Sequence, residues 1–421
     1  MKGLYSIGIY LANFVITIAS LFNSKLKKGV IGRKNTFLKL KKTITPEDKT
    51  FWFHCASLGE YEQGLPVFEA LKAKHPDHKV VLSFFSPSGY DVRKNAKIAD
   101  VVVYLPLDSK ANAKRFLDLV NPDYTLFVKY EIWPNFLHEI KKRDLKAILI
   151  SAVFRKDHIF FKWYGSYAKS ALFAFNHIFT QDENSKTLLH RIGYNAVSVS
   201  GDTRFDRVSN QLKVDNTVSF IEEFKNDKLC VVFGSSWPDD DKLYMDFINS
   251  NTNADVKFVI APHNIKSSYV ASLKSQLNVK TICYSELTEH QNLAHYKVFV
   301  LDTIGYLSKA YSYADMAYVG GGAGTTGLHN ILEPAVFGIP ILIGKNYDKF
   351  PEAKELINLG GVTSLASSSA FNASLSALIT DAILRKKQGD ITKSFIDSNT
   401  GAVLKIMAYL ESKLIFYSSK R

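Results

Sequence analysis

Cysteine is scarce in this chain, and low-complexity blocks and internal repeats are absent from it. The three cysteines, Cys55, Cys230 and Cys283, have neither metal-ligand nor disulfide spacing, which favours core thiols in a reducing compartment. With 46% hydrophobic and 22% charged residues the composition is that of a globular protein, and 421 residues suffice for two domains of ordinary size.

Acidic residues are missing from the first 46 positions, which contain nine Lys or Arg. Those nine account for most of the net charge of +13, so the remaining chain is only mildly basic. A surface that binds nucleic acid needs basic clusters within the folded body. The charge distribution therefore argues against a nucleic-acid partner.

No charged residue occurs between Leu4 and Phe22, a stretch that would form a helix about 28 Å long and match a bilayer core. Lys2 precedes the stretch and a run of basic residues follows it, whereas a cleaved signal peptide carries its charge first. The pattern predicts a membrane anchor and basic flank over residues 1–34, with the body on the cytoplasmic side. Polar residues within the stretch leave an interfacial helix as the main alternative, and a cleaved signal as the lesser one. Either helix places the body beside anionic lipid.

From Thr50 onward, short apolar strands alternate with helical stretches in two successive series. This order predicts two doubly wound α/β domains that face each other across a cleft, with ligands beyond the carboxyl ends of the strands. The predicted domains are residues 35–210 and 229–421, joined by a linker over 211–228. The predicted strands are 51–55, 79–83, 101–105, 124–128, 147–151, 178–181 and 196–200 in the first series, then 229–233, 257–261, 298–301, 316–319 and 340–343.

A glycine-rich loop connects two strands of the second series within residues 319–345. It is not a P-loop, because no GK[ST] follows, and it lacks GxGxxG spacing. We interpret it as a βαβ unit whose loop allows a ligand to approach the backbone and whose helix N-terminus faces that ligand. The alternative is a tight turn without a ligand. Asn330 and Glu333, one helical turn apart, favour the ligand.

Other polar residues also follow strands. Glu60 comes after the first strand, where it either completes a capping box with Ser57 or accepts a proton from a hydroxyl group. The helix N-terminus is expected to lower the pKa of Glu60 and keep it ionised. Glu131 follows a strand and precedes a Trp-Pro pair, which suggests a functional position. The alternative is that Glu131 is an exposed carboxylate in a loop. Arg204 either meets a phosphate or carboxylate, or pairs with a neighbouring aspartate.

These residues resemble the motifs of one family, the Kdo (3-deoxy-D-manno-octulosonic acid) transferases of lipopolysaccharide assembly, which have the two-domain GT-B fold. The family motif HxASxGE is matched by residues 54–60, and a stretch like ExxWPN by residues 131–135. The resemblance implies that Glu60 is the general base and that Glu131 and Arg204 stabilise the transition state. Arg204 stands where the family usually has Lys, which changes the contact geometry. Support on the acceptor side is implied for His54, Ser57 and Gly59.

The resemblance also implies contacts to a cytidine nucleotide from three loops. A Pro-Arg-His stretch of the family is represented without its Arg, and a DTxGEL stretch has Tyr306 in place of Glu. A GGHNxLEP stretch is closely matched by residues 327–334. The implied donor-binding residues are Pro262, His263, Ile304, Gly305, Tyr306, Asn330, Ile331, Leu332 and Glu333.

The reaction implied is inverting transfer of Kdo from CMP-Kdo to a lipid A precursor (lipid IVA) at the cytoplasmic face of the inner membrane. A monophosphate leaving group carries less charge than a diphosphate, and the chain has no His/Cys cluster, so we expect neither an essential metal nor a cofactor. Two alternatives remain at this point. One is a GT-B glycosyltransferase or epimerase that uses a UDP-sugar, and the other is a non-catalytic, membrane-tethered nucleotide- or glycan-binding module.

Overall fold

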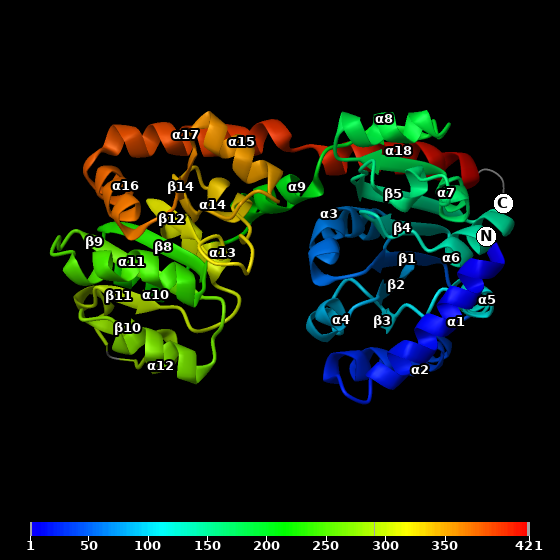
Figure 1. The fold of residues 1–421 in the computed structure, drawn as a ribbon, viewed down its shortest axis with the longest axis horizontal. Helices are drawn as coiled ribbons and strands as arrows, with labels where there is room; N and C mark the ends of the chain where they lie inside the picture. Colours follow the sequence, from blue (N-terminus) through cyan, green and yellow to red (C-terminus); the bar gives the residue numbers. More distant parts are fainter. Residues whose placement is uncertain (1, 290, 419–421) are drawn as a thin grey trace. The chain divides into compact units, whose positions relative to one another are not determined.

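The computed structural model describes residues 2–289 and 291–418 and folds them into two compact units (Figure 1). The first unit contains the chain up to Arg207 together with the segment from Thr400 onward, and the second is Val208–Asn399. The predicted domain ranges also include positions 1, 290 and 419–421, which lie outside the described residues.

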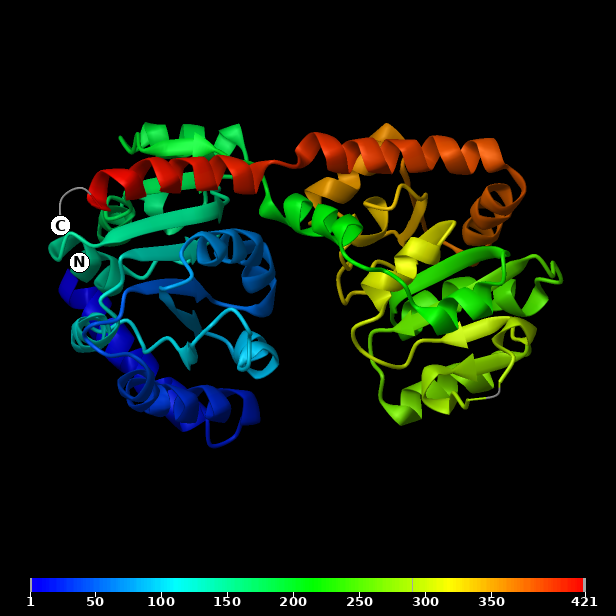
Figure 2. The same cartoon turned by 180° about the vertical axis from the view of Figure 1, so that it is seen from behind.

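The first unit is built on a seven-stranded parallel sheet in the order β3-β2-β1-β4-β5-β6-β7 (Figures 1 and 2). The order reverses direction between β1 and β4, which is the switch point of a doubly wound sheet. Its strands are mostly apolar and buried because helices cover both faces. They are β1 Thr50–Cys55, β2 Lys79–Phe84, β3 Val101–Tyr104, β4 Tyr124–Val128, β5 Lys146–Ala152, β6 His177–Thr180 and β7 Val197–Val199.

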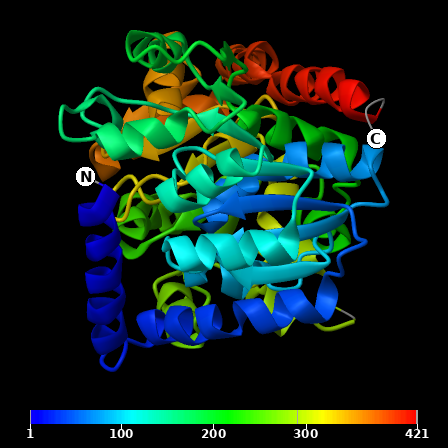
Figure 3. The same ribbon diagram turned by 90° about the vertical axis from the view of Figure 1, so that its right-hand side faces the viewer.

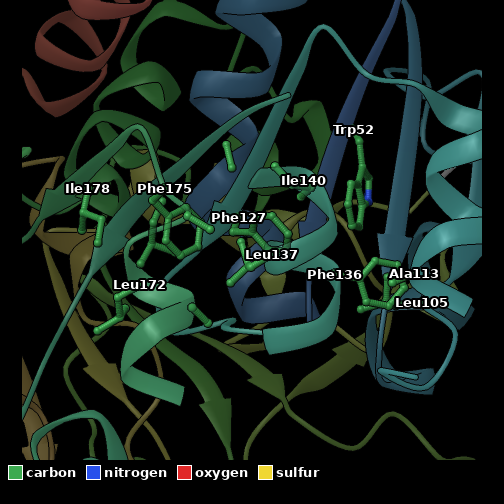
Figure 4. Packing of buried hydrophobic residues seen from close by; sticks show 14 of the residues in the cluster. Trp52, Leu105, Ala113, Phe127, Phe136, Leu137, Ile140, Leu172, Phe175 and Ile178 are labelled. Carbon is green, nitrogen blue, oxygen red and sulfur yellow. The ribbon is translucent and has the colours of Figure 1, made fainter. Parts of the chain in front are cut away.

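Two apolar clusters fill the space between this sheet and its helices, one on each face. Figure 4 shows part of one, in which Trp52, Phe127 and Phe136 pack with aliphatic side chains from the covering helices. The helices of this unit are α1 Lys2–Ala19, α2 Ser24–Thr43, α3 Leu58–Lys74, α4 Pro87–Arg93, α5 Lys110–Val120, α6 Pro134–Lys142, η1 Ile159–Phe161, α7 Ser166–Leu172, α8 Glu183–Arg191, α9 Thr203–Asn210, which extends into the second unit, and α18 Ala402–Ser418.

The second unit has its own seven-stranded parallel sheet, in the order β10-β11-β9-β8-β12-β13-β14. Every predicted strand of both units is present, but the sequence pattern does not predict β10 and β14. These are short strands at the two edges, and Thr363 and Ser364 interrupt the apolar run of β14. The strands are β8 Leu229–Ser236, β9 Val256–Pro262, β10 Thr281–Cys283, β11 Val298–Val300, β12 Met316–Val319, β13 Ile341–Gly344 and β14 Val362–Leu365.

Helices cover both faces of the second sheet as well. Part of the predicted linker 211–228 is folded, because α10 buries Ile221 and Phe224 in the core of this unit. The helices are η2 Gln211–Lys213, α10 Ser219–Lys225, α11 Pro238–Ser250, α12 Ser267–Ser275, η3 Tyr284–Glu286, η4 Leu293–His295, α13 Leu307–Ala310, η5 Tyr311–Tyr313, α14 Leu332–Ala335, α15 Pro351–Leu359, α16 Ser368–Thr380 and α17 Ala382–Asn399.

The C-terminal helix corrects the predicted domain boundary, which assigned residues 229–421 to one domain. The helix α18 packs instead against α3 of the first unit, where Ile406, Met407 and Leu410 join the buried cluster. Asp206 fixes the start of α18 by accepting hydrogen bonds from the backbone N–H groups of Gly401 and Ala402 at 2.9 and 3.1 Å. A helical pattern alone does not reveal which core a terminal helix joins.

The N-terminal segment forms two helices, α1 and α2, joined by a short turn (Figure 3). The helix α1 ends at Ala19 rather than continuing to Phe22. Among residues 2–289 and 291–418, no helix combines the length and the apolar character needed to cross a membrane. The Tyr5 hydroxyl donates a 2.7 Å hydrogen bond to Oδ2 of the buried Asp108, which fastens the first turns of α1 to the body of the unit.

Candidate active site

Glu60 lies in the first turn of α3, directly after β1, and is almost fully buried. Its Oε2 atom accepts a hydrogen bond from the backbone N–H of Ala56. Ser57 is the N-cap residue, but its side chain makes no capping hydrogen bond. The reciprocal capping box is therefore not formed, and Glu60 alone interacts with the backbone N–H groups of Ala56 and Ser57 before the helix.

Glu131 follows β4 and is also buried, which corrects the reading of an exposed loop carboxylate. Its Oε2 atom lies 3.0 Å from Nε1 of Trp133 and 3.3 Å from Nε2 of His54. The loop leaves the strand sharply, because Lys129 has a left-handed φ of 68° and donates its N–H to the carbonyl of Ile150 at 2.8 Å. Left-handed backbone at a non-glycine residue is strained and is often found at functional sites.

His54 lies behind Glu131, within the sheet, and is fully buried. Its Nδ1 atom is 2.9 Å from Oγ of Ser83, which also accepts a 2.7 Å hydrogen bond from Nε1 of Trp52. His54 therefore fixes the position of Glu131 from below. Of the other two residues implied on the acceptor side, Ser57 is half-buried, and Gly59 has open space where a Cβ atom would lie.

The electrostatics of Glu60 differ from the prediction that the helix N-terminus lowers its pKa. Burial and the neighbouring Glu131 together raise the pKa of Glu60 to about 7. The N–H groups of Ala56 and Ser57 and the charge of Lys129 act in the opposite direction but do not compensate. Desolvation outweighs the local helix terminus, and the carboxyl group titrates near neutral pH.

Arg204, in α9, forms the ion pair that was the alternative reading of this residue. Its Nη2 and Nε atoms both lie 2.8 Å from Oδ2 of Asp202. The backbone N–H of Arg204 also donates to Oδ1 of Asp202 at 2.9 Å. The guanidinium is thus oriented by an aspartate two residues earlier and is half-buried.

In the second unit the glycine loop is arranged around a protein carboxylate, which the sequence pattern does not predict. Asp240, in the first turn of α11, is fully buried. Its Oδ2 accepts from the N–H of Gly321 at 2.7 Å, and its Oδ1 accepts from the N–H of Ala323 at 3.2 Å and from the Tyr318 hydroxyl at 2.7 Å. These loop N–H groups bind the protein itself, so they are not directed at a ligand.

The glycines are needed because backbone approaches backbone. A Cβ atom on Gly320 would lie 2.5 Å from the carbonyl oxygen of Ser235 at the end of β8. One on Gly321, where φ is +90°, would lie 2.0 Å from the oxygen of Gly327. The predicted ligand approach at the triple glycine is therefore replaced by close packing of the loop on its own neighbours.

The helix after the glycine loop is shorter than predicted, since α14 is a single turn of four residues. The Asn330 side chain accepts the N–H of Leu332 at 3.2 Å and donates to Oε1 of Glu333 at 3.2 Å. Ser308 donates to Oε2 of Glu333 at 3.1 Å. Asn330 and Glu333 are adjacent, as predicted, and Glu333 links this loop to α13. Ile331 and Leu332 are buried, which leaves only their backbone groups for a ligand.

His263, after β9, stacks on a ring that sequence reasoning missed. The rings of His263 and Trp237 are 4.5 Å apart, as are those of His263 and His329. Nε1 of Trp237 donates to Nε2 of His329 at 3.0 Å. Burial lowers the pKa of His263, and burial with the adjacent His263 lowers that of His329 to about 4. Trp237 directly follows β8, so its place at a strand end was the available signal.

The remaining predicted loop follows β11. Ile304 is largely exposed, and Gly305 has a φ of +100° that favours glycine. Tyr306 is half-buried and packs edge-on against Phe220, with ring centroids 5.2 Å apart. Through Ser308 and Glu333 this loop reaches the Asn330 loop, and the stacked rings connect His263 with His329. The structure therefore brings the three predicted loops to one edge of the sheet, next to Pro262 at the end of β9.

No group of three His, Cys, Asp or Glu side chains suited to a metal ion occurs among the described residues. The acidic run 239–241 is directed at separate partners. Asp239 pairs with Lys242 at 2.9 Å, Asp240 binds the glycine loop, and Asp241 accepts from the Tyr244 hydroxyl. The three cysteines are buried and free, as predicted.

Comparisons with known proteins show which proteins this chain resembles. Residues 31–207 match the family model described as 3-deoxy-D-manno-octulosonic-acid transferase (kdotransferase). The 3-deoxy-D-manno-octulosonic acid transferase of Haemophilus influenzae is 25% identical over 383 residues, or 88% of each chain. The enzyme of the same name from Aquifex aeolicus is 25% identical over 320 residues, covering 74% of this chain and 80% of the relative.

Among solved structures, UDP-GlcNAc 2-epimerase from Neisseria meningitidis aligns with a TM-score of 0.61 at 15% identity, covering 86% of this chain and all of the epimerase. That likeness concerns the fold, two Rossmann-like units of the GT-B type. The sequence matches, and not the fold, indicate a glycosyltransferase. By sequence, the chain resembles the 3-deoxy-D-manno-octulosonic acid (Kdo) transferases, through the family model over residues 31–207 and through relatives that cover 73% to 88% of it.

Proposed function

We propose that this chain transfers Kdo from CMP-Kdo to a lipid A precursor, lipid IVA, with inversion at the anomeric carbon, in assembly of the lipopolysaccharide inner core. The observation that carries the proposal is the pair of buried carboxyl groups that follow β1 and β4, in which burial and the neighbouring Glu131 raise the pKa of Glu60 to about 7. A general base is most effective when its pKa lies near the working pH. The names of the relatives support Kdo as the sugar.

Each group has one role in the proposed reaction. Glu60 removes the proton of the acceptor hydroxyl as that oxygen forms a bond to the anomeric carbon. The bond from the anomeric carbon to the phosphate oxygen breaks, and CMP leaves with the electron pair. Glu131, held by His54 and Trp133, faces the positive charge that develops on the sugar ring. Arg204, oriented by Asp202, is assigned to the negative charge on the leaving phosphate.

The donor nucleotide is assigned to the second unit, at the edge formed by the loops after β9, β11 and β12. Asn330 and Glu333 are the side chains proposed to contact it, with Pro262, His263, Gly305 and the backbone of neighbouring residues. Glu333 is partly exposed although it holds two loops together through Ser308 and Asn330. A carboxylate in such a position can accept hydrogen bonds from ribose hydroxyl groups.

The acceptor is a lipid, and the proposed working place is the cytoplasmic face of the inner membrane. Nine large apolar side chains of the N-terminal segment 4–22 are exposed, from Leu4 to Phe22. Lysines at the start of α2 follow them directly. An exposed apolar face beside basic residues is suited to the interface of an anionic bilayer, so an interfacial helix replaces the predicted spanning one in this proposal.

The proposal is tested by turnover with CMP-Kdo and a tetraacylated lipid A precursor, followed by mass spectrometry of the acceptor. We expect the acceptor to gain the mass of Kdo and CMP to be released. UDP-N-acetylglucosamine serves as the competing donor, because the fold is shared with epimerases that act on it. Turnover of the UDP-sugar without transfer from CMP-Kdo would refute the proposal.

Nucleotide binding separates this reading from the UDP-sugar alternative without any turnover. CMP is expected to raise the melting temperature, and UMP to raise it less at equal concentration. Asn330→Ala and Glu333→Ala should each reduce the CMP shift, while Glu355→Ala, on α15, should leave it unchanged. Equal shifts in all variants would mean that the Asn330–Glu333 loop does not hold the nucleotide.

A further inference from the structure

The loop between β5 and α7 exposes an unusual amount of aromatic surface. Trp163 is 91% exposed and Tyr164 52% exposed, and Ile159 on the same loop is also open to solvent. The rings of Trp163 and Tyr164 are 5.5 Å apart, edge to face. Trp52, in contrast, is fully buried, and Trp133 and Trp237 are half-buried. Large exposed aromatic groups of this kind mark interaction surfaces.

The exposure does not result from a loosely held loop. Phe154 and Phe160 are buried in the core on either side of the turn. Successive backbone hydrogen bonds join Phe161 to His158 at 3.0 Å and Gly165 to Lys162 at 3.0 Å. Gly165 packs so closely that a Cβ atom there would lie 1.7 Å from the carbonyl oxygen of Ile159. The loop is therefore folded and presents Trp163 and Tyr164 outward from a fixed base.

The loop lies next to α1, which carries the exposed apolar face. The rings of Tyr5 on α1 and Tyr167 on α7 are 5.2 Å apart, and Tyr5 is fastened to Asp108. Figure 1 shows the start of α1 close to α7 within the first unit. Trp163 and Tyr164 immediately precede α7, so two apolar surfaces are neighbours on one unit.

The charge around the loop matches that of an anionic surface. Residues 155–169 contain four Lys or Arg and one acid, Asp157, which pairs with Arg155. The N-terminal 46 residues have nine basic residues and no acidic one. Trp and Tyr are the residues enriched at membrane–water interfaces, because their rings are apolar and their polar atoms remain hydrated. Basic residues beside them are attracted to anionic headgroups.

The same loop contacts the candidate catalytic site. The rings of His158 and Tyr130 are 6.1 Å apart, and Tyr130 precedes Glu131. Burial raises the pKa of Tyr130, and the charges of Glu60 and Glu131 raise it further. A bilayer in contact with Trp163 would thus lie beside the residues proposed to act on the sugar hydroxyl of a lipid.

We propose that residues 159–164 are a second membrane contact, separate from α1, in which Trp163 and Tyr164 enter the interface of an anionic bilayer. This inference rests on the proposed function for its purpose, the delivery of a lipid acceptor to Glu60. The physical contact itself requires no transfer reaction, so it is tested independently.

Trp163 is its own reporter. The full-length protein is mixed with vesicles of phosphatidylethanolamine and phosphatidylglycerol that contain lipids brominated in the acyl chain. We expect the exposed tryptophan emission to shift to shorter wavelength and to be quenched by the brominated lipid, with loss of iodide accessibility. Trp163→Phe should remove these changes, because the other three tryptophans are buried or half-buried.

The affinity for the vesicles is measured by co-sedimentation. Trp163→Ser should weaken binding on the order of tenfold, as expected when one large apolar side chain no longer enters the interface. Ile383→Ser is the matched control, since Ile383 is 83% exposed but belongs to the other unit, and its binding should equal that of the wild type. Transfer to a detergent-solubilised acceptor is measured in parallel, and Trp163→Ser should retain it.

Three results would overturn the inference. One is vesicle binding during which Trp163 stays accessible to iodide and unquenched. Another is an emission shift that follows protein concentration without vesicles, which would assign the loop to contact with a second copy of the chain. The third is equal binding to pure phosphatidylcholine vesicles, which would remove the anionic surface as the partner. Loss of transfer in detergent by the wild type would count against the proposed function alone.

Discussion

Two opposing effects act on the pKa of Glu60, which binds a backbone N–H group at the start of its helix and yet titrates near neutral pH. The N–H of Ala56 binds one carboxylate oxygen, which favours the charged form. Burial and Glu131 disfavour that form and prevail, so that the pKa of Glu60 rises to about 7. A base of this kind is ionised over part of its working range and retains more proton affinity than an ordinary glutamate.

The rate of transfer is therefore expected to depend on pH. Activity requires ionised Glu60, so kcat/KM should rise with pH up to about 7 and then level off. Glu131→Gln removes a negative neighbour, which should move this acidic limb to lower pH even though the rate itself falls. Glu69→Gln, an exposed glutamate on the same helix, is the control and should leave the limb in place. If the acidic limb of the pH profile stays near pH 7 in Glu131→Gln, the interaction between the two carboxyl groups does not determine its position.

The same shift predicts a cost in stability. Because the folded state raises the pKa of Glu60 from about 4.5 to about 7, the folded state binds the proton more tightly than the unfolded state. Stability from this group is complete below pH 4.5 and is lost as pH rises through 7, by on the order of 3 kcal/mol. Glu60→Gln should therefore gain melting temperature relative to the wild type between pH 5 and about 8. A difference that does not change with pH would contradict this.

At the scale of elements, the glycine loop shows where the sequence is informative and where it is not. The strands on either side of the loop were predicted because buried parallel strands are continuous apolar runs. The role of the glycines could not be predicted from the sequence. Glycine is needed whether the loop backbone packs against Ser235 or against a ligand. The N–H groups bind Asp240, which lies some eighty positions earlier on α11. No local pattern reports such a partner.

Asp240 is expected to be a major determinant of stability in the second unit. Asp240→Ala would leave the N–H groups of Gly321 and Ala323 and the Tyr318 hydroxyl buried without an acceptor. The unfolding transition of this unit should lose on the order of 3 kcal/mol, and CMP binding should weaken with it. The neighbouring Asp239→Ala is the control, since its solvent-exposed pair with Lys242 should contribute little to the stability. Equal losses for both variants would refute the role of Asp240.

The site was predicted unevenly for the same physical reason. Glu60 and Glu131 were predicted because each comes shortly after an apolar strand and lies in a family motif, whereas the pairing of those two strands is seen only in the structure. His54 was found through the motif, but its buried contact with Glu131 depends on the pairing of β1 with β4. Trp237 was missed although it also follows a strand, because an aromatic residue there has no chemistry that the sequence alone reveals.

At the scale of the whole molecule, acidic side chains that could bind a metal ion are paired with neighbouring groups of the protein. The acidic run 239–241 is occupied by Lys242, the glycine loop and the Tyr244 hydroxyl, and the proposed leaving group is a monophosphate of modest charge. We therefore expect EDTA to leave the transfer rate unchanged at constant ionic strength. Strong inhibition that is reversed by added Mg²⁺ would contradict this prediction.

Membrane contact also belongs to this scale. The proposal combines the exposed face of α1, the basic start of α2 and the Trp163 loop into one surface of the first unit. The sequence indicated the first two through the uncharged stretch and the lysines after it. The loop was not indicated, because residues 155–169 show an ordinary mixture of aromatic and basic residues until the fold sorts Phe154 and Phe160 inward and Trp163 outward.

The most direct test of the account measures Kdo transfer and CMP binding in the same samples of wild-type and Glu60→Ala protein. The account predicts that the wild type adds Kdo to the lipid A precursor, whereas Glu60→Ala shows no transfer above background and an unchanged thermal shift with CMP. Glu69→Ala should behave as the wild type in both measurements. Transfer by Glu60→Ala at a rate near that of the wild type would contradict the account, because it would remove Glu60 from the reaction.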